Sequence, residues 1–188
     1  YPCKAGHICG VGETDPTPCP GGTYYPGTDA QSSHDCFPCP LSTYCPSGSA
    51  SYISCPPGTY CPQFNSSSPT ICPPGSYCDA GGLTSISGKT CPEGYYCPQG
   101  TIDPIVCFPG GYCPAGSAYP EQCPAGFKGT DRPVNHTFNA FTQMGTACHS
   151  CPPGTYGSDP YRLTCATCPP GYICEGETKV ANPVNASD

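Results

Sequence analysis

No long run of hydrophobic and polar positions in this chain follows the period of a helix. Pro or Gly interrupts nearly every stretch of helical length, and an apolar spacing of 3.6 residues is absent. What recurs instead is a short phrase, Cys55-Pro56-Pro57-Gly58-Thr59-Tyr60-Cys61. The pattern therefore predicts short two-stranded hairpins and coil, with almost no helix.

The phrase occurs ten times with small changes, and each occurrence begins at an opening cysteine. Successive openings lie 16 to 28 residues apart. A repeat this short cannot enclose a core of its own, so neighbouring repeats must stack in a row. The opening cysteines are Cys3, Cys19, Cys39, Cys55, Cys72, Cys91, Cys107, Cys123, Cys151 and Cys168.

Three residue types keep fixed places after the opening cysteine. Pro follows it directly in eight repeats, Gly stands three places after it in all but the repeat with Ser42, and Tyr stands five places after it in seven. Pro fixes φ and Gly tolerates a positive φ, so Cys-Pro-x-Gly predicts a tight turn. We expect the Tyr to begin a short extended stretch and to pack against the next repeat.

The composition indicates a domain stabilised by disulfides and not a globular domain with an apolar core. Leu, Ile, Val and Phe supply only 21 residues, whereas Pro supplies 28, Gly 24 and Cys 20. Cysteine at this density is typical of scaffolds in which disulfides replace a missing core. We therefore expect a small disulfide-rich repeat protein, an elongated rod of short β-hairpins and coil.

The cysteines can be paired in order, the first with the second and the third with the fourth, which uses all twenty. A pairing shifted by one would join Cys45 to Cys55 and leave Cys3 and Cys174 over, and spacing alone does not exclude it. The in-order pairs are Cys3–Cys9, Cys19–Cys36, Cys39–Cys45, Cys55–Cys61, Cys72–Cys78, Cys91–Cys97, Cys107–Cys113, Cys123–Cys148, Cys151–Cys165 and Cys168–Cys174.

Two of the longer repeats resemble a known module. Cys19-Pro20-Gly21-Gly22-Thr23-Tyr24 with Cys36-Phe37-Pro38-Cys39, and the matching residues from Cys151 to Cys168, are similar to ephrin-receptor-like and tumour-necrosis-factor-receptor-like cysteine-rich repeats. The resemblance implies the pairs Cys19–Cys36 and Cys151–Cys165. The shorter repeats resemble arrays in protist and algal surface proteins, which implies an elongated extracellular module.

The repeats divide the chain into four segments. Residues 3–122 hold tandem short and long repeats, residues 123–150 a long repeat with an aromatic insert, and residues 151–174 the terminal repeats. Residues 175–188 form a tail without cysteine.

The insert is the main irregularity of the pattern. Its apolar residues either fold back as a local mini-core or form a contact with another molecule, because a rod one repeat thick has little interior. We predict an interface in which copies of the chain associate into a polymer. The candidate interface residues are Phe127, Phe138, Phe141 and Met144.

Disulfides persist in oxidising compartments, so we expect a secreted or extracellular protein, at a cell surface or on an appendage. Sequons at Asn65, Asn135 and Asn185 predict covalent glycans. The net charge of −7 argues against nucleic acid as a partner. No apolar run reaches membrane-spanning length, so we expect no direct membrane insertion.

Candidate chemistry is sparse. The Cys-x2-Cys pairs with His34 and His149 nearby have the residue types of a zinc site, but each second cysteine also opens a repeat, so a structural disulfide explains it. No nucleophile elbow, metal-binding histidine pair or phosphate loop is present in the sequence. We expect no enzyme activity and no cofactor.

These features favour a structural extracellular glycoprotein, a subunit of a surface appendage, matrix or filament such as a flagellar hair. The alternative is a ligand-binding stalk of a cell-surface receptor or adhesin.

Overall fold

The computed structural model describes all of the chain except residues 1–2, 13, 130–146, 158–160, 177–181 and 184–188. The described residues contain almost no helix and form nine antiparallel pairs of short strands, with one 3-10 turn, η1 (Ser33–Asp35). The predicted fold class, a small disulfide-rich protein of repeated hairpins, is confirmed. The pairs are β1 (His7–Ile8) with β2 (Thr17–Pro18), β3 (Thr23–Tyr24) with β4 (Phe37–Pro38), β5 (Thr43–Tyr44) with β6 (Ile53–Ser54), β7 (Thr59–Tyr60) with β8 (Thr70–Ile71), β9 (Tyr95–Tyr96) with β10 (Ile105–Val106), β11 (Gly111–Tyr112) with β12 (Glu121–Gln122), β13 (Phe127–Gly129) with β14 (Cys148–Ser150), β15 (Thr155–Tyr156) with β16 (Ala166–Thr167), and β17 (Tyr172–Ile173) with β18 (Asn182–Pro183).

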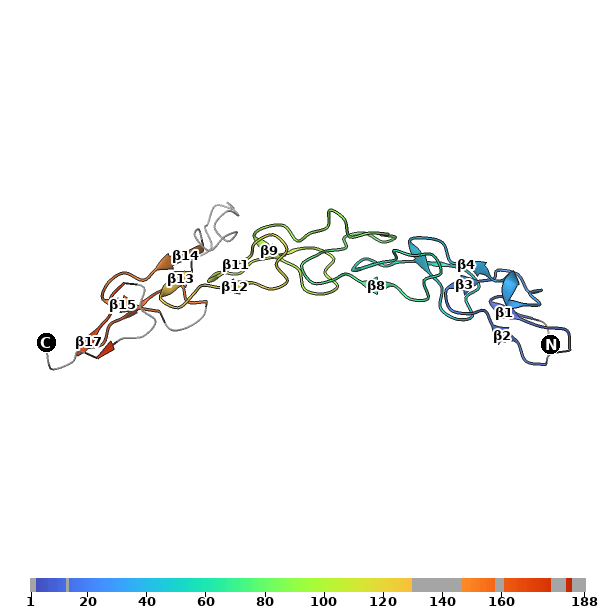
Figure 1. The fold of residues 1–188 in the computed structure, drawn as a ribbon, viewed down its shortest axis with the longest axis horizontal. Coiled ribbons are helices and arrows are strands. Elements are labelled where there is room, and N and C mark those ends of the chain that lie inside the picture. Colours follow the sequence, from blue (N-terminus) through green and yellow to red (C-terminus); the bar gives the residue numbers. More distant parts are fainter. Residues whose placement is uncertain (1–2, 13, 130–146, 158–160, 177–181, 184–188) are drawn as a thin grey trace. The chain divides into compact units, whose positions relative to one another are not determined.

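The chain divides into two compact units, which are described separately. The first contains residues 1–89 and 99–103, and the second contains residues 90–98 and 104–188. Within each unit the hairpins follow one another in chain order (Figure 1). The first unit holds β1 to β8 and the second β9 to β18.

Each hairpin uses the same parts of the repeat. Its first strand begins four residues after the opening cysteine, and its second strand ends directly before the next opening cysteine in every hairpin but that of β17 and β18. In the pair of β3 and β4, Thr23 lies opposite Pro38 and Tyr24 opposite Phe37. The Tyr of the repeat therefore begins a short extended stretch, as expected.

The turn before the first strand starts one residue later than the sequence pattern suggested. The carbonyl of Pro20 accepts hydrogen bonds from the N–H of Thr23 (3.1 Å) and from its hydroxyl (2.7 Å). The turn is therefore Pro-x-Gly-Thr rather than Cys-Pro-x-Gly. This register places Gly22, with φ of 87°, at the third turn position, where a type II turn requires a positive φ.

We call the third residue after each opening cysteine the first-turn residue. It has a positive φ in all ten repeats, and the only one that is not glycine, Ser42, has φ of 65°. Sterics disfavour this region for residues with a Cβ, which explains why glycine recurs there. Glycine at this position is thus a backbone requirement of the repeat.

A second turn, which the sequence pattern did not predict, follows the second cysteine of six repeats, and in the Cys151 repeat a similar turn precedes the second cysteine. Its left-handed residue, which we call the second-turn residue, lies nine or ten places after the opening cysteine. The turn is closed by bonds such as the one from the Ser49 N–H to the Pro46 carbonyl (3.2 Å). The second-turn residues are Gly12, Gly48, Asn65, Gly82, Gly100, Gly116 and Tyr161.

Consecutive repeats are joined by a recurring set of four backbone hydrogen bonds, which we call the repeat ladder. Because the bonded atoms belong to the backbone, the ladder places few demands on side chains. Between the Cys55 and Cys72 repeats of the first unit, the donors and acceptors are Gly58 N–H to Cys78 O (2.8 Å), Cys61 N–H to Leu83 O (2.8 Å), Gly82 N–H to Cys55 O (2.8 Å) and Cys72 N–H to Gly58 O (2.9 Å). In the second unit the Cys91 and Cys107 repeats are joined by Gly94 N–H to Cys113 O (2.8 Å), Cys97 N–H to Ser117 O (2.9 Å), Gly116 N–H to Cys91 O (2.8 Å) and Cys107 N–H to Gly94 O (2.9 Å).

The interior of the repeats consists mainly of sulfur. Among the described residues, the largest fully buried side chains are all cysteines. The aliphatic residues that join them, such as Ile8, Ala30 and Ala147, form only small clusters. The expected role of disulfides in place of an apolar core is therefore seen directly, whereas tyrosines such as Tyr24 and Tyr60 are only half-buried.

Part of the cysteine-free tail belongs to the last hairpin. Asn182 and Pro183 form β18 and pair with Ile173 and Tyr172 of β17. This segment therefore completes a hairpin within its own chain.

Candidate functional site

The twenty cysteines form ten disulfides, and the pairing is the in-order one. The Cα atoms of the bonded residues lie 5.5 to 6.2 Å apart, within the range of ordinary disulfides. Cys45 is bonded to Cys39 and Cys55 to Cys61, so the shifted pairing does not occur in the structure. The pairs are Cys3–Cys9, Cys19–Cys36, Cys39–Cys45, Cys55–Cys61, Cys72–Cys78, Cys91–Cys97, Cys107–Cys113, Cys123–Cys148, Cys151–Cys165 and Cys168–Cys174.

These disulfides differ in exposure along the chain. Cys55 and Cys61 have no exposed surface, as do the cysteines of several neighbouring repeats. Cys3, Cys9 and Cys168, by contrast, are half-buried. A dissolved thiol can therefore reach Cys3, Cys9 and Cys168 more readily than the fully buried Cys55 and Cys61.

The Cys-x2-Cys pairs hold no thiolate for a metal or for redox chemistry, because every cysteine is in a disulfide. Of their neighbours, His34 lies in η1 and His149 in β14, and both are exposed. Within the described ranges, no three residues of the types His, Cys, Asp and Glu gather as they would around a metal ion.

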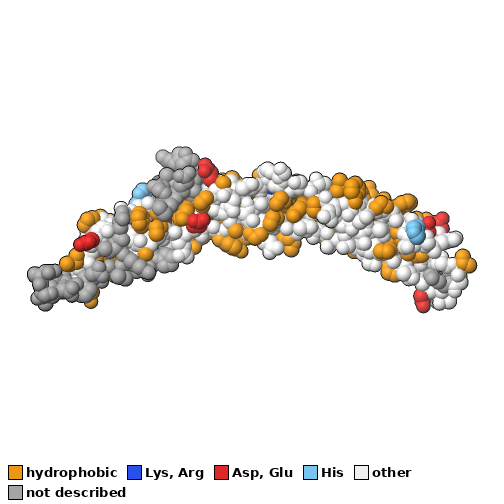
Figure 2. Space-filling view, viewed as in Figure 1, with side chains coloured by type: hydrophobic (Ala, Val, Ile, Leu, Met, Phe, Trp, Pro, Cys, Tyr) orange, Lys and Arg blue, Asp and Glu red, His pale blue; other side chains and the backbone are white. Residues whose placement is uncertain are grey.

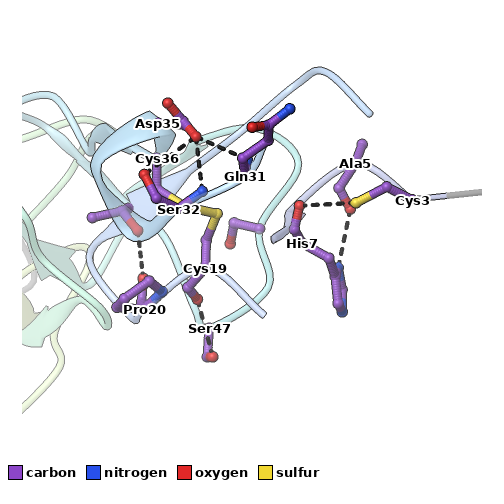
Figure 3. The surroundings of a disulfide bond; sticks show 12 residues. Cys3, Ala5, His7, Cys19, Pro20, Gln31, Ser32, Asp35, Cys36 and Ser47 are labelled. Carbon is purple, nitrogen blue, oxygen red and sulfur yellow. Dashed lines mark hydrogen bonds between the residues drawn. A yellow bond between two sulfur atoms is a disulfide. The ribbon is translucent and has the colours of Figure 1, made fainter. Parts of the chain in front are cut away.

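The Cys19–Cys36 disulfide illustrates how a long repeat is held (Figure 3). The carboxylate of Asp35 accepts hydrogen bonds from the N–H of Ser32 (2.9 Å) and of Gln31 (2.8 Å), and closes η1 next to Cys36. These backbone donors lower the pKa of Asp35 below its usual range. From the next repeat, the Ser47 hydroxyl donates to the carbonyl of Cys19 (3.1 Å).

Asn65, the first predicted glycosylation site, lies in an exposed second turn. Its N–H donates to the carbonyl of Cys39 (3.0 Å), and its φ is 58°, a left-handed value that Asn tolerates better than most residues. The next residue, Ser66, accepts a bond from the N–H of Cys45 (2.9 Å). The backbone of the sequon is thus fixed while the Asn side chain remains at the surface. The other two sites, Asn135 and Asn185, lie outside the described residues.

Of the four predicted interface residues, only Phe127 is described. It lies on β13 opposite Ser150 and is half-buried. It packs with Tyr112 against the cluster of Cys123, Ala147 and Cys148. Phe127 therefore contributes to local packing in its own chain. Phe138, Phe141 and Met144 lie outside the described residues, so the interface that they would form stays a prediction.

An exposed aromatic group in the first unit was not anticipated from the sequence. The ring centroids of Tyr24 and Tyr52 lie 5.4 Å apart with nearly perpendicular planes, and those of Tyr24 and Phe37 lie 5.9 Å apart. Phe37 and Tyr52 remain 50% and 52% exposed. Only the hairpin register reveals this group, because its members come from both strands of one hairpin and from the loop of the next repeat.

A second aromatic group lies in the second unit. Phe108, which replaces the usual Pro after the opening cysteine, lies 4.8 Å from Tyr161 and 6.5 Å from Tyr96 between ring centroids. Tyr161 is a second-turn residue with φ of 58°. Its ring packing accompanies a backbone conformation that is unusual for tyrosine.

Comparison with protein-family models and with curated protein sequences finds no match for this chain. Across the described residues, no helix has both the length and the apolar character needed to span a membrane. Ten disulfides indicate an extracellular or secreted protein, since such bonds persist where the environment is oxidising.

Proposed function

We propose that this chain is a structural extracellular glycoprotein, a subunit of a surface appendage, matrix or filament such as a flagellar hair. The observation that carries the proposal is the combination of one disulfide per repeat with the repeat ladder between repeats. Closing a seven-residue loop by a disulfide removes about 2.4 kcal/mol of unfolded-chain entropy. Each repeat is thus held covalently and joined to the next through its backbone, as suits a material that must withstand tension and proteases.

The surface supports a role that does not depend on charge or catalysis. The lysines and arginines of the described residues are Lys4, Lys89, Lys128 and Arg162, and Figure 2 shows few charged side chains among the hydrophobic and polar ones. One of these cations, Lys89, is paired with Asp79 at 2.7 Å. A surface with so few cations offers little for steering an anionic ligand.

The experiment is immunogold electron microscopy of the native material, with antibodies raised against the oxidised chain. We expect label at many points along extracellular fibres, hairs or matrix, and glycan on the extracted protein. Label confined to the plasma membrane, without any fibre or matrix, would contradict the proposal. Pre-adsorption of the antibody with the purified chain is the control.

The aromatic group of Tyr24, Phe37 and Tyr52 favours one second candidate, a ligand-binding stalk of a receptor or adhesin. Exposed aromatic rings are enriched where proteins bind one another. In that case, the double variant Phe37→Ser, Tyr52→Ser would lower attachment of chain-coated beads to cells that carry the ligand. In a purely structural subunit, bead attachment would be absent in both forms.

A further inference from the structure

Phe64 is an aromatic residue that the described chain leaves uncovered. Its side chain is 62% exposed and packs against none of the buried clusters of the described residues. The exposed rings of Phe37 and Phe108 each have aromatic neighbours, whereas Phe64 has no ring contact with another described residue. One exposed apolar side chain implies no partner by itself, so a second observation must show what covers it.

The second observation is the glycosylation sequon that directly follows Phe64. The hydroxyl of Ser66 donates to the carbonyl of Gln63 (2.9 Å), so Phe64 and Asn65 are the two corner residues of a single turn. Both side chains are exposed. A glycan attached to Asn65 therefore begins beside the Phe64 ring.

The backbone of this turn is fixed by the neighbouring repeats. The N–H of Cys45 donates to the carbonyl of Ser66 (2.9 Å). On the Cys19 repeat, a Cβ on Gly21 would lie 3.1 Å from the Cβ of Ser67. The turn thus holds the corner residues in one arrangement, and a sugar on Asn65 would need little reorganisation to meet the ring.

The residue type at the left-handed position points in the same direction. Asn65 occupies a place that is glycine in five other second turns. A left-handed Asn costs less than most residues with a Cβ but more than glycine. Asn is the residue that can carry an N-linked glycan, and a favourable contact of that glycan would offset the cost of the backbone.

The chemistry of the two groups is complementary. The first sugar of an N-linked glycan is N-acetylglucosamine, whose ring presents C–H groups on its faces. The face of a phenylalanine ring carries the negative part of its quadrupole, which attracts these weakly positive hydrogens. Covering the ring also removes apolar surface from water. Such a contact requires no charged side chain.

We propose that the first sugar of the glycan on Asn65 packs on the Phe64 ring and holds this second turn closed. The turn then opens less often, and the hydrogen bond from the Cys45 N–H to the Ser66 carbonyl is protected. The inference rests on the glycoprotein character of the proposed function. It gives that glycan a structural role at a junction of repeats.

The direct test is NMR spectroscopy of the full, oxidised chain secreted with its glycans. We expect nuclear Overhauser contacts between the Phe64 ring protons and the first sugar on Asn65. The ring current should also shift the protons of this sugar upfield. Phe64→Ser should abolish the contacts and the shift, whereas Phe64→Tyr, which keeps an aromatic face, should retain both.

Amide hydrogen exchange tests the effect on the turn. The Cys45 N–H should exchange about threefold to tenfold more slowly in the glycosylated chain than in Ser67→Ala, as expected for one ring contact that closes a local opening. Ser67→Ala removes the glycan but keeps the Cβ that lies on Gly21. In the background of Phe64→Ser, the same removal should leave the exchange rate unchanged, which completes a double-mutant cycle.

The Cys107 repeat, which has no sequon, supplies matched controls. Its Ser117 carbonyl accepts the equivalent bond from the Cys97 N–H (2.9 Å), which should exchange at one rate in all these forms. Tyr119→Ser removes a ring that is 65% exposed and should leave the protection of Cys45 intact.

A glycan on Asn65 without ring contacts, or protection that persists in Phe64→Ser, would overturn this contact and retain the glycoprotein. A secreted chain without glycan on Asn65 would reject both the contact and the predicted glycan at this site. Absence of gold label from fibres, with the ring contact present, would reject the structural function and retain the contact.

Discussion

At the residue scale, left-handed backbone positions determine which amino acids each repeat accepts. Gly22 is required both for its positive φ of 87° and for space, because a Cβ there would meet the carbonyl of Asn65. Ser42 holds the same position in the next repeat with φ of 65°, so there a residue with a Cβ is accommodated at the cost of a left-handed backbone.

Ser42→Gly should therefore stabilise the chain, by about 0.5 to 1 kcal/mol, since it removes the left-handed cost for a residue with a Cβ. Gly22→Ser, the reverse change in the preceding repeat, should destabilise by more than that because it adds a collision with the Asn65 carbonyl. Urea unfolding of the oxidised variants measures both. Equal effects of opposite sign would show that φ alone decides the position.

The predicted glycan at Asn65 also depends on single residues of its sequon. Ser67→Ala removes the hydroxyl that the sequon requires without changing the left-handed backbone of Asn65. We expect the mass of the secreted protein to fall by one N-linked glycan. The control is Ser68→Ala, next to the sequon, which should keep the glycan on Asn65. Absence of a glycan from Asn65 in both the unchanged protein and this control would contradict the prediction.

At the element scale, each hairpin has only two or three residues per strand and depends on the turns that close it. At η1 the backbone N–H groups of Gln31 and Ser32 donate hydrogen bonds to the carboxylate of Asp35, which acts as their acceptor in this short turn. Further along, Lys89 bonds Asp79 and lies 5.2 Å from the centre of the Tyr77 ring, which closes the loop of the Cys72 repeat.

The stability that Asp35 contributes should depend on pH with a definite sign. Because its pKa in the folded chain is lowered from 3.8, the contribution is fully present above about 3.8 and is lost as the pH falls through the lower folded value. Titration of the Asp35 carboxyl followed by NMR checks the direction. Added salt should change the pKa little, since backbone donors are its main cause, and a pKa above 3.8 would contradict the hydrogen bonds.

At the scale of the whole molecule, stability is distributed along the repeats and does not reside in one core. The small clusters around Ile8 and around Ala147 each involve few residues, and the disulfides between them are mostly buried. Repeats that contact only their neighbours can open one by one from an end.

Limited reduction of the folded chain should show this order. With a small excess of a mild thiol and an alkylating label, Cys3, Cys9 and Cys168 should be labelled before Cys55 and Cys61, because the former are half-exposed and the latter fully buried. Mass spectrometry of peptides gives the labelling order. After unfolding and full reduction, all twenty cysteines should be labelled equally, and the same equality in the folded chain would refute the order.

The sequence predicted the repeats, the hairpins, the near-absence of helix and the use of disulfides as an interior, because these follow from local chemistry. A glycine three places after Cys55 or Cys91 indicates a left-handed backbone whatever the tertiary structure. A chain with many cysteines and few aliphatic residues can form an interior only from disulfides. A glycan at Asn65 was predicted from the sequon for the same reason, and it stays a prediction. Its exposure and its place in a second turn became known only from the fold.

The contacts between repeats were decided only by the tertiary structure. Sequence spacing left the shifted cysteine pairing open, since a cysteine such as Cys45 has a possible partner on each side, and the choice depends on which Cα atoms the hairpins bring together. The ladder from Gly58 to Cys78 and the aromatic group around Tyr24 involve residues from different repeats. Backbone atoms make most of these contacts. Because every residue has backbone atoms, the sequence does not show which residues will form such contacts.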